Sequence, residues 1–312
     1  VRKGTDPLNP ASYPSGLVGL VVRGQPSEYG VARPGGYGTN HYDSGMVVTS
    51  QVEKYVGIAS GDRQVCTGWT GSGSVPVSGS GTQVVFTIAS ASTLTCNFAQ
   101  QCELKLDVVS DGTTSGVPGS ITGSSTGWYE TGASITLTAA PLPEFRFAGW
   151  FGDVPVAMTN QNPLTLSMSQ RRTIFARFVR KEYTFGVVSG RGTPTPSGNT
   201  SYPHGEILSP SVNSPIIVGG TMYECTGWTL AGHEPSSGTD TTFTITLTNN
   251  AVLSWLWRTN ALLTAYAGAG GTVSGSESGW YPLGSTVSLA ATANTNWLFV
   301  QWSGDVPPAS IA

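Results

Sequence analysis

Charge is scarce in this chain of 312 residues. Charged side chains make up 11% of the sequence and the formal net charge is −3, whereas an average soluble protein is roughly 25% charged. Nucleic acids and anionic membranes are bound through clustered Lys and Arg, so we expect no nucleic acid partner. No run of 18 apolar residues occurs, and we therefore expect no membrane insertion.

Cysteine is also rare, and its spacing argues against a structural zinc site. The chain has 4 cysteines and no Cys-x-x-Cys pair. The sequence likewise lacks paired carboxylates, a nucleophilic triad and a cluster of metal-ligating side chains. From the residues alone we expect no enzyme, no catalytic residue, no metal and no cofactor.

Glycine, proline and tryptophan are plentiful instead. The chain contains 41 Gly, 20 Pro and 9 Trp, and 38% of its residues are hydrophobic. The apolar residues fall in short alternating runs separated by Gly- and Ser-rich stretches, which is typical of half-buried strands joined by turns. No helical period of useful length occurs, so the sequence predicts an all-β protein with about five strands per module.

Three marks recur along the chain in a fixed order. The first is a tryptophan, at Trp69, Trp150, Trp228 and Trp302, spaced by 81, 78 and 74 residues. A Tyr-x-x-Gly motif precedes each tryptophan, at Tyr42, Tyr129, Tyr202 and Tyr281. A strand ending on an aromatic residue follows the first three tryptophans by 28 or 29 residues, at Phe98, Phe178 and Trp257. These marks indicate a repeat of about 80 residues, and we expect them to form its structural core.

The copies alternate in kind. Residues 66–70 and 225–229 share the sequence CTGWT, whereas residues 152–155 and 304–307 share GDVP. We therefore expect tandem small antiparallel β-modules in alternating pairs, forming an elongated array. The predicted divisions are a linker from an upstream module at 1–16, modules at 17–99, 100–180 and 181–259, and a fourth module at 260–312 that lacks its last two strands.

The second and fourth copies resemble the divergent bacterial relatives of the internalin B-repeat. The second carries the motif as Phe147-Ala148-Gly149-Trp150 and Ala176-Arg177-Phe178. The fourth keeps Phe299 and Trp302, with Gln301 in place of the glycine. The resemblance implies a non-enzymatic structural repeat region of a large bacterial surface protein, acting as a stalk or scaffold. It also implies an extracellular or cell-surface location, although no export signal is present in this stretch.

Two alternatives stay open at this point. One is a self-assembling filament or surface-layer subunit joined through edge strands, a homopolymer in which further copies of the chain are the partners. The other is an adhesive or carbohydrate-binding module, for which Trp128 and Tyr129 would be the stacking residues. Under the stalk interpretation, the partners are neighbouring modules of the same parent chain.

The remaining reactive side chains have simpler interpretations. Cys66 and Cys225 precede their tryptophans close to where the small apolar Ala148 and Val300 stand in the other copies, which favours buried core thiols. A disulfide between Cys66 and Cys96 is the alternative, since Cys96 matches an inward-facing alanine.

The sequence signals for a nucleophile, a calcium site or metal-binding histidines are weaker than those of the cysteines. Residues 123–127 fit the pattern G-x-S-x-G, but they form a Gly- and Ser-rich turn without a histidine partner. Asp153 is expected to begin a turn, because carboxylates are too sparse here for calcium. The three histidines are expected to be surface residues, at His41, His204 and His233.

Overall fold

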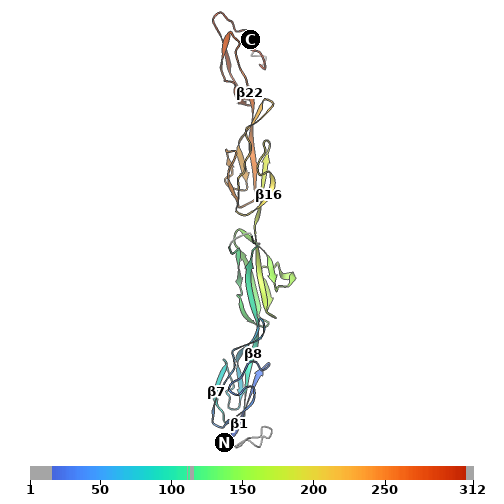
Figure 1. The fold of residues 1–312 in the computed structure, drawn as a ribbon, viewed down its shortest axis with the longest axis vertical. Helices are drawn as coiled ribbons and strands as arrows, with labels where there is room; N and C mark the ends of the chain where they lie inside the picture. The colour runs from blue at the N-terminus through green and yellow to red at the C-terminus, as the bar shows by residue number, and fades with distance from the viewer. Residues whose placement is uncertain (1–15, 111, 113–115, 307–312) are drawn as a thin grey trace. The chain divides into compact units, whose positions relative to one another are not determined.

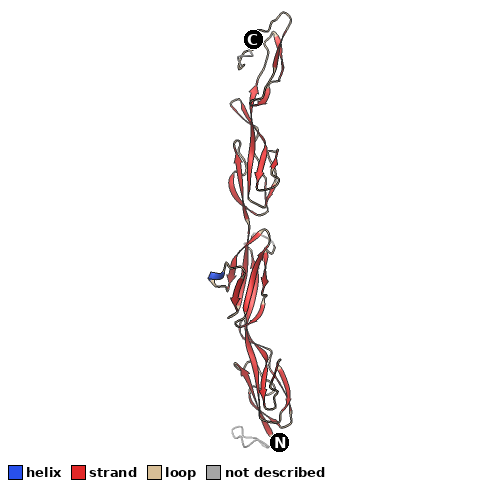
Figure 2. Ribbon diagram, turned by 180° about the vertical axis from the view of Figure 1, so that it is seen from behind, coloured by secondary structure: helices blue, strands red, loops and turns tan. Residues whose placement is uncertain are grey.

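The structure, a computed structural model, describes residues 16–110, 112 and 116–306. The linker predicted at residues 1–16 therefore lies almost entirely outside the described residues. The all-β prediction is confirmed: strands dominate the ribbon in Figure 2, and among the described residues one short 3-10 helix, η2 (Val156–Met158), interrupts them. In the described part of the chain, no helix has the length and apolar character needed to cross a membrane.

The chain divides into two compact units between Val179 and Arg180. Among the described residues, unit 1 contains two hydrophobic cores, named core A and core B, and unit 2 contains a third, core C. Their buried residues come from three separate stretches, 20–98, 102–178 and 185–255. These stretches fall inside the first three predicted modules, whose boundaries stay a prediction.

Core A lies between a large sheet and a small one. Its strands are β1 (Leu17–Gln25), β2 (Gly38–Asp43), β3 (Val47–Gln51), β4 (Tyr55–Ala59), β5 (Asp62–Ser72), β6 (Ser78–Gly79), β7 (Gln83–Thr87) and β8 (Ser92–Val109). In the large sheet β8 pairs with β1 and β5, while β3 and β7 form the small sheet. Leu20 and Leu94 from the large sheet and Val48 and Phe86 from the small one are buried in the core between them.

Core B repeats this plan. Its further strands are β9 (Gly119–Gly123), β10 (Gly127–Glu130), β11 (Ser134–Pro141), β12 (Phe145–Gly152), β13 (Leu164–Ser167) and β14 (Arg172–Arg180). Strands β10, β12 and β14 belong to the sheet of β8, and β9, β11 and β13 form the second sheet. The predicted alternation is confirmed, since Leu104, Ile135, Leu137 and Ile174 are all fully buried.

The prediction of about five strands is too low for this core. The described residues form seven strands around it, β8 to β14. The two that the sequence pattern does not reveal, β9 and β10, are short and have no alternation of apolar and polar residues. They pair with β11 and β8 through their backbones, and backbone pairing leaves no signature in side-chain periodicity.

Strand β8 belongs to both cores of unit 1 (Figure 1). Its 18 residues contribute Leu94, Cys96 and Phe98 to core A, then Cys102 and Leu104 to core B. No loop separates the two sets of residues. The two cores are therefore joined by an unbroken strand and not by a linker.

Most strand pairs are antiparallel, as predicted, but the first and last strands of each core in unit 1 are parallel neighbours. In core A, β1 pairs with β8 from Leu20 opposite Ser92 to Gln25 opposite Asn97. In core B, β8 pairs with β14 from Leu104 opposite Arg172 to Val109 opposite Arg177. The chain therefore enters each core at the start of one strand of a parallel pair. It leaves the core at the far end of the other strand.

Unit 2 contains core C and the strands that follow it. The strands are β15 (Glu182–Ser189), β16 (Gly198–Pro203), β17 (Glu206–Leu208), β18 (Ile216–Val218), β19 (Thr221–Ala231), β20 (Ser237–Gly238), β21 (Ile245–Leu247), β22 (Ala251–Leu263), β23 (Gly271–Gly275), β24 (Gly279–Pro282) and β25 (Leu289–Ala293). The first and last strands of core C, β15 and β22, again pair in parallel. Strand β22 continues beyond core C and pairs with β24, as β8 does with β10.

The Tyr-x-x-Gly mark is a turn that ties the two sheets of a core together. Its glycine has a left-handed backbone in every copy, with φ of 89° at Gly45, 91° at Gly132, 81° at Gly205 and 86° at Gly284. Glycine adopts this conformation without the strain that other residues suffer. In the first three copies the glycine N–H donates to a carbonyl at or next to the end of a strand in the small sheet, at Ile88, Met168 and Leu247.

Candidate functional site

The recurring tryptophans are core residues in three of the four copies. Trp69, Trp150 and Trp228 are buried, whereas Trp302 is half-buried. Each of the first three sits in the strand just before the turn that leads to the small sheet or to η2. The repeat therefore marks packing positions, and it does not mark a recurring pocket.

Trp150 is the most enclosed of the four. Its ring meets Phe147 edge to face, with centroids 5.2 Å apart, and Phe147 meets Phe178 at 6.1 Å. The indole Nε1–H donates to the Gln161 carbonyl at 2.7 Å. Packing and a satisfied polar atom together fix this ring, as is usual for a buried indole.

Trp69 and Trp228 are held differently. Each ring lies against a glycine, Gly79 or Gly238, so closely that an added Cβ would approach the ring within 2.5 Å. Phe243 also stacks on Trp228, with centroids 3.8 Å apart and rings inclined by 14°. Among the described residues neither Nε1 has a hydrogen-bond partner. These glycine contacts were not predicted, because a Ser-Gly pair in a turn-rich chain carries no distinctive signal.

The glycine before each of these tryptophans makes a β-bulge. The register shifts between Cys66 and Gly68 and again between Cys225 and Gly227. Gly68 has φ of 143°, and a Cβ there would lie 2.4 Å from the Gly79 carbonyl oxygen. Only glycine fits this close approach, which turns the following tryptophan inward.

The other repeat marks are buried or half-buried. Phe98 and Phe178 are buried, and Trp257 is half-buried with its Nε1–H donating to the Ser189 hydroxyl at 3.0 Å. The four tyrosines are half-buried, and Tyr42, Tyr129 and Tyr202 pack against cores A, B and C, whereas Tyr281 contacts none of the three. The hydroxyls of Tyr129 and Tyr281 each donate to the carbonyl four residues earlier.

The cysteines are buried free thiols. The structure does not join Cys66 and Cys96 by a disulfide, although both lie in core A. The Cys66 thiol donates to the carbonyls of Gly68 and Gly81. Burial raises the pKa of the Cys66, Cys96 and Cys102 thiols, that of Cys96 to about 11. A thiol that stays protonated at neutral pH is a poor nucleophile.

The histidines and acidic residues do not converge. His41 is exposed as expected, but His204 and His233 are half-buried, the first beside Tyr183 and the second bonded to Thr248. Within the described ranges, no group of three or more His, Cys, Asp or Glu is placed to hold a metal.

Asp153 and the G-x-S-x-G stretch both lie in turns. Asp153 bonds through its carboxylate to the N–H of Thr173 and so fixes the turn after β12. The G-x-S-x-G stretch is a turn between β9 and β10, two strands, and no helix follows it.

An arginine between two aromatic rings was not predicted. The guanidinium carbon of Arg63 in β5 lies 4.0 Å from the ring centroid of Tyr55 and 4.2 Å from that of Trp128. Its Nε–H donates to the Gln101 side chain at 2.9 Å. Because Tyr55 lies in β4, a strand of core A, and Trp128 in β10, a strand of core B, this stack spans the junction of the two cores. It also covers one face of Trp128, the ring suggested for sugar stacking.

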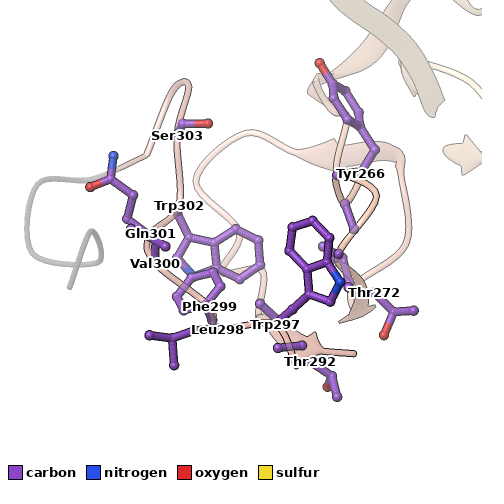
Figure 3. Close-up of a pocket in the computed structure, with 17 residues that line it drawn as sticks. Tyr266, Thr272, Thr292, Trp297, Leu298, Phe299, Val300, Gln301, Trp302 and Ser303 are labelled. Atoms are coloured by element: carbon purple, nitrogen blue, oxygen red, sulfur yellow. The ribbon is translucent and has the colours of Figure 1, made fainter. Parts of the chain in front are cut away.

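A cavity lies in the fourth copy of the repeat. Its volume is about 290 Å³, and aromatic side chains form much of its lining (Figure 3). Trp297 and Trp302 lie toward one another across it, and Phe299 contacts Trp302 edge to face at 5.5 Å. This pair reproduces the geometry of Phe147 and Trp150. In core B, Trp150 and Phe145 are buried, whereas Trp302 is half-buried and Trp297, which corresponds to Phe145, is 62% exposed.

The fold and the recurring cores define this chain as a tandem all-β repeat. Residues 112–182 and 261–310 match the divergent InlB B-repeat domain family, which confirms the resemblance for the second and fourth copies. That family is a non-catalytic repeat domain and is typical of bacterial surface proteins.

A solved structure, the Bacillus anthracis TIE protein, is similar over 77% of this chain at 8% identity and a TM-score of 0.29. The chain spans 50% of the length of that structure. No curated protein matches the chain.

Proposed function

We propose that this chain is a structural stalk or scaffold region of a large extracellular bacterial surface protein, with neighbouring modules of the same parent chain as its partners. One observation carries the proposal: the residues that recur in the sequence are the ones that fill cores A, B and C. Recurrence is thus explained by packing. When the recurring residues of a repeat are packing residues, each further copy adds length and rigidity to the protein and presents no reactive centre.

The chemistry of the side chains supports a non-enzymatic role. The thiols of Cys66, Cys96 and Cys102 are buried and burial raises their pKa values, and the described residues offer no cluster of metal-binding groups. The matched family supports the surface location, because it is typical of bacterial surface proteins.

Labelling of intact cells tests this proposal. Antibodies raised against residues 16–180 should bind unpermeabilised cells of the source bacterium in immunogold microscopy. Deletion of that stretch from the parent gene should bring a tag placed on the far side of it closer to the cell wall. Labelling only after permeabilisation, or an unchanged tag distance, would refute the proposal.

Self-assembly is a second candidate, favoured by the exposed apolar face around the cavity. Trp297, Leu298 and Val300 lie within four consecutive residues and are 62%, 84% and 80% exposed, and large exposed apolar patches mark interaction sites. The occupant proposed for this face is a second copy of the chain. Sedimentation velocity should then show concentration-dependent association that Trp297→Ser abolishes. Val156→Ser, which changes another exposed apolar residue, should leave it intact; monomers at all concentrations would exclude this candidate.

A further inference from the structure

We propose that each core is a tensile clamp, which resists a pull along the chain because its first and last strands form a parallel pair loaded in shear. The inference gives the proposed stalk a mechanical role. The clamp itself is argued from strand pairing, and only its biological purpose rests on the proposed stalk function. Its basis is the parallel pairing of β1 with β8, β8 with β14 and β15 with β22.

The direction of the load follows from the topology. The chain enters core B through β8 and leaves it through β14, and the two strands run side by side in the same direction. A pull on the chain therefore draws β8 and β14 past each other along their length. The hydrogen bonds between them run across the strands and are evenly spaced, so they must be strained together. In an antiparallel hairpin pulled from its ends, the same bonds would open one after another.

The backbone N–H and C=O groups of β8 and β14 point toward each other, as hydrogen bonds between the two strands require. The N–H of Thr173 donates to the Asp153 carboxylate and its carbonyl accepts from the Asp153 N–H. Thr173 therefore faces β12. Because successive strand residues present their backbone groups to opposite sides, Ile174 and Ala176 face β8. On the other strand, the N–H of Leu106 donates to the Thr126 hydroxyl and faces away from β14, so its two neighbours in β8 face β14.

Side-chain packing opposes sliding as well. Ile174 lies opposite Leu106 and Ala176 opposite Val108, and all four contact core B. A slip of one residue, about 3.3 Å, turns every inward side chain of a strand outward. The pair can therefore move only slightly before the buried Ile174 and Ala176 lose their places.

Core A and core C have the same arrangement. Val22 lies opposite Leu94 in core A, and Val187 lies opposite Leu253 in core C. In unit 1 the clamps are in series, because β8 is the last strand of core A and the first of core B. A load carried by the first clamp reaches the second through one continuous strand.

Pulling the same core in two directions tests the clamp. All four native cysteines are buried, so handles for optical tweezers attach to introduced cysteines at exposed positions of the full chain. Gln100→Cys with Arg177→Cys loads β8 and β14 in shear from opposite ends. Val117→Cys with Arg177→Cys applies force at one end and peels β14 away, since Gly119, two residues after Val117, lies beside Phe178.

The shear variant should unfold core B at a force several-fold higher than the peeling variant. End-to-end pulling of the unmodified chain through terminal tags should give forces close to those of the shear variant. Equal forces in the two directions, or end-to-end forces as low as those for peeling, would overturn the proposal. Neither result alters the cell-labelling outcome, so failure of the clamp and failure of the stalk role are distinguishable.

Discussion

Replacing Trp150 with alanine should unfold core B selectively. The ring is fully buried, and a buried tryptophan removes roughly 150–250 Å² from water. At about 25 cal/mol per Å² this burial is worth about 4–6 kcal/mol, and measured Trp→Ala changes in cores cost about 3–5 kcal/mol. The change also leaves the Gln161 carbonyl without its indole donor. We therefore expect a loss of about 4 kcal/mol in the free energy of unfolding of core B.

The native cysteines provide a readout for each core. Cys102 is fully buried in core B, and Cys225 is buried in core C. A thiol reagent reaches them when the surrounding core opens, and mass spectrometry measures the labelling of each cysteine separately. A loss of about 4 kcal/mol should speed the labelling of Cys102 roughly 10³-fold. Labelling of Cys225 in unit 2 should not change.

The equivalent residue of the fourth copy is the matched control. Trp302 is only half-buried, so Trp302→Ala should leave the protection of Cys102 unaltered. Unchanged protection of Cys102 in Trp150→Ala would refute the assignment of Trp150 as the centre of its core. Equal deprotection of Cys102 and Cys225 would instead refute the independence of cores B and C.

Three further predictions concern unit 1. Arg63→Ala removes the cation between two rings and should cost about 1–2 kcal/mol, seen as a lower melting temperature that a lysine at this position restores only in part. Gly68→Ala places a Cβ against a carbonyl and should destabilise core A in urea titrations, whereas Gly57→Ala, with nothing within 4 Å, should be nearly neutral. Burial raises the pKa of Cys96 from 9.0 to about 11, so the native state keeps a proton that the unfolded state loses. The contribution of Cys96 to stability should be full below pH 9 and decline between pH 9 and 11, visible as a falling urea midpoint that Cys96→Ala flattens.

The sequence was sufficient to predict the fold class and the main packing residues. Alternation of apolar and polar residues identifies strands with one buried face, and Leu104, Ile135 and Ile174 lie where that alternation puts them. The repeats revealed packing positions that a single copy of the sequence could not show. A tryptophan that recurs at intervals of 74 to 81 residues, within the same order of marks, indicates a core position.

Two features had no signal in the sequence. The parallel pairing of first and last strands is invisible to periodicity, because parallel and antiparallel strands with one buried face have the same alternation. The Arg63 stack depends on Tyr55, Arg63 and Trp128 meeting across two cores. Such a meeting follows from the position of β10 against β8, which backbone hydrogen bonds determine.

The unbroken course of β8 limits how a gene encoding such an array can gain or lose modules. A crossover between residues 99 and 100 would splice two foreign half-strands, and their side chains would have to suit two cores at once. A crossover at Lys181, between β14 and β15, leaves every strand whole. We therefore expect insertions and deletions in this gene to involve pairs of modules, so that the array changes length in steps of two.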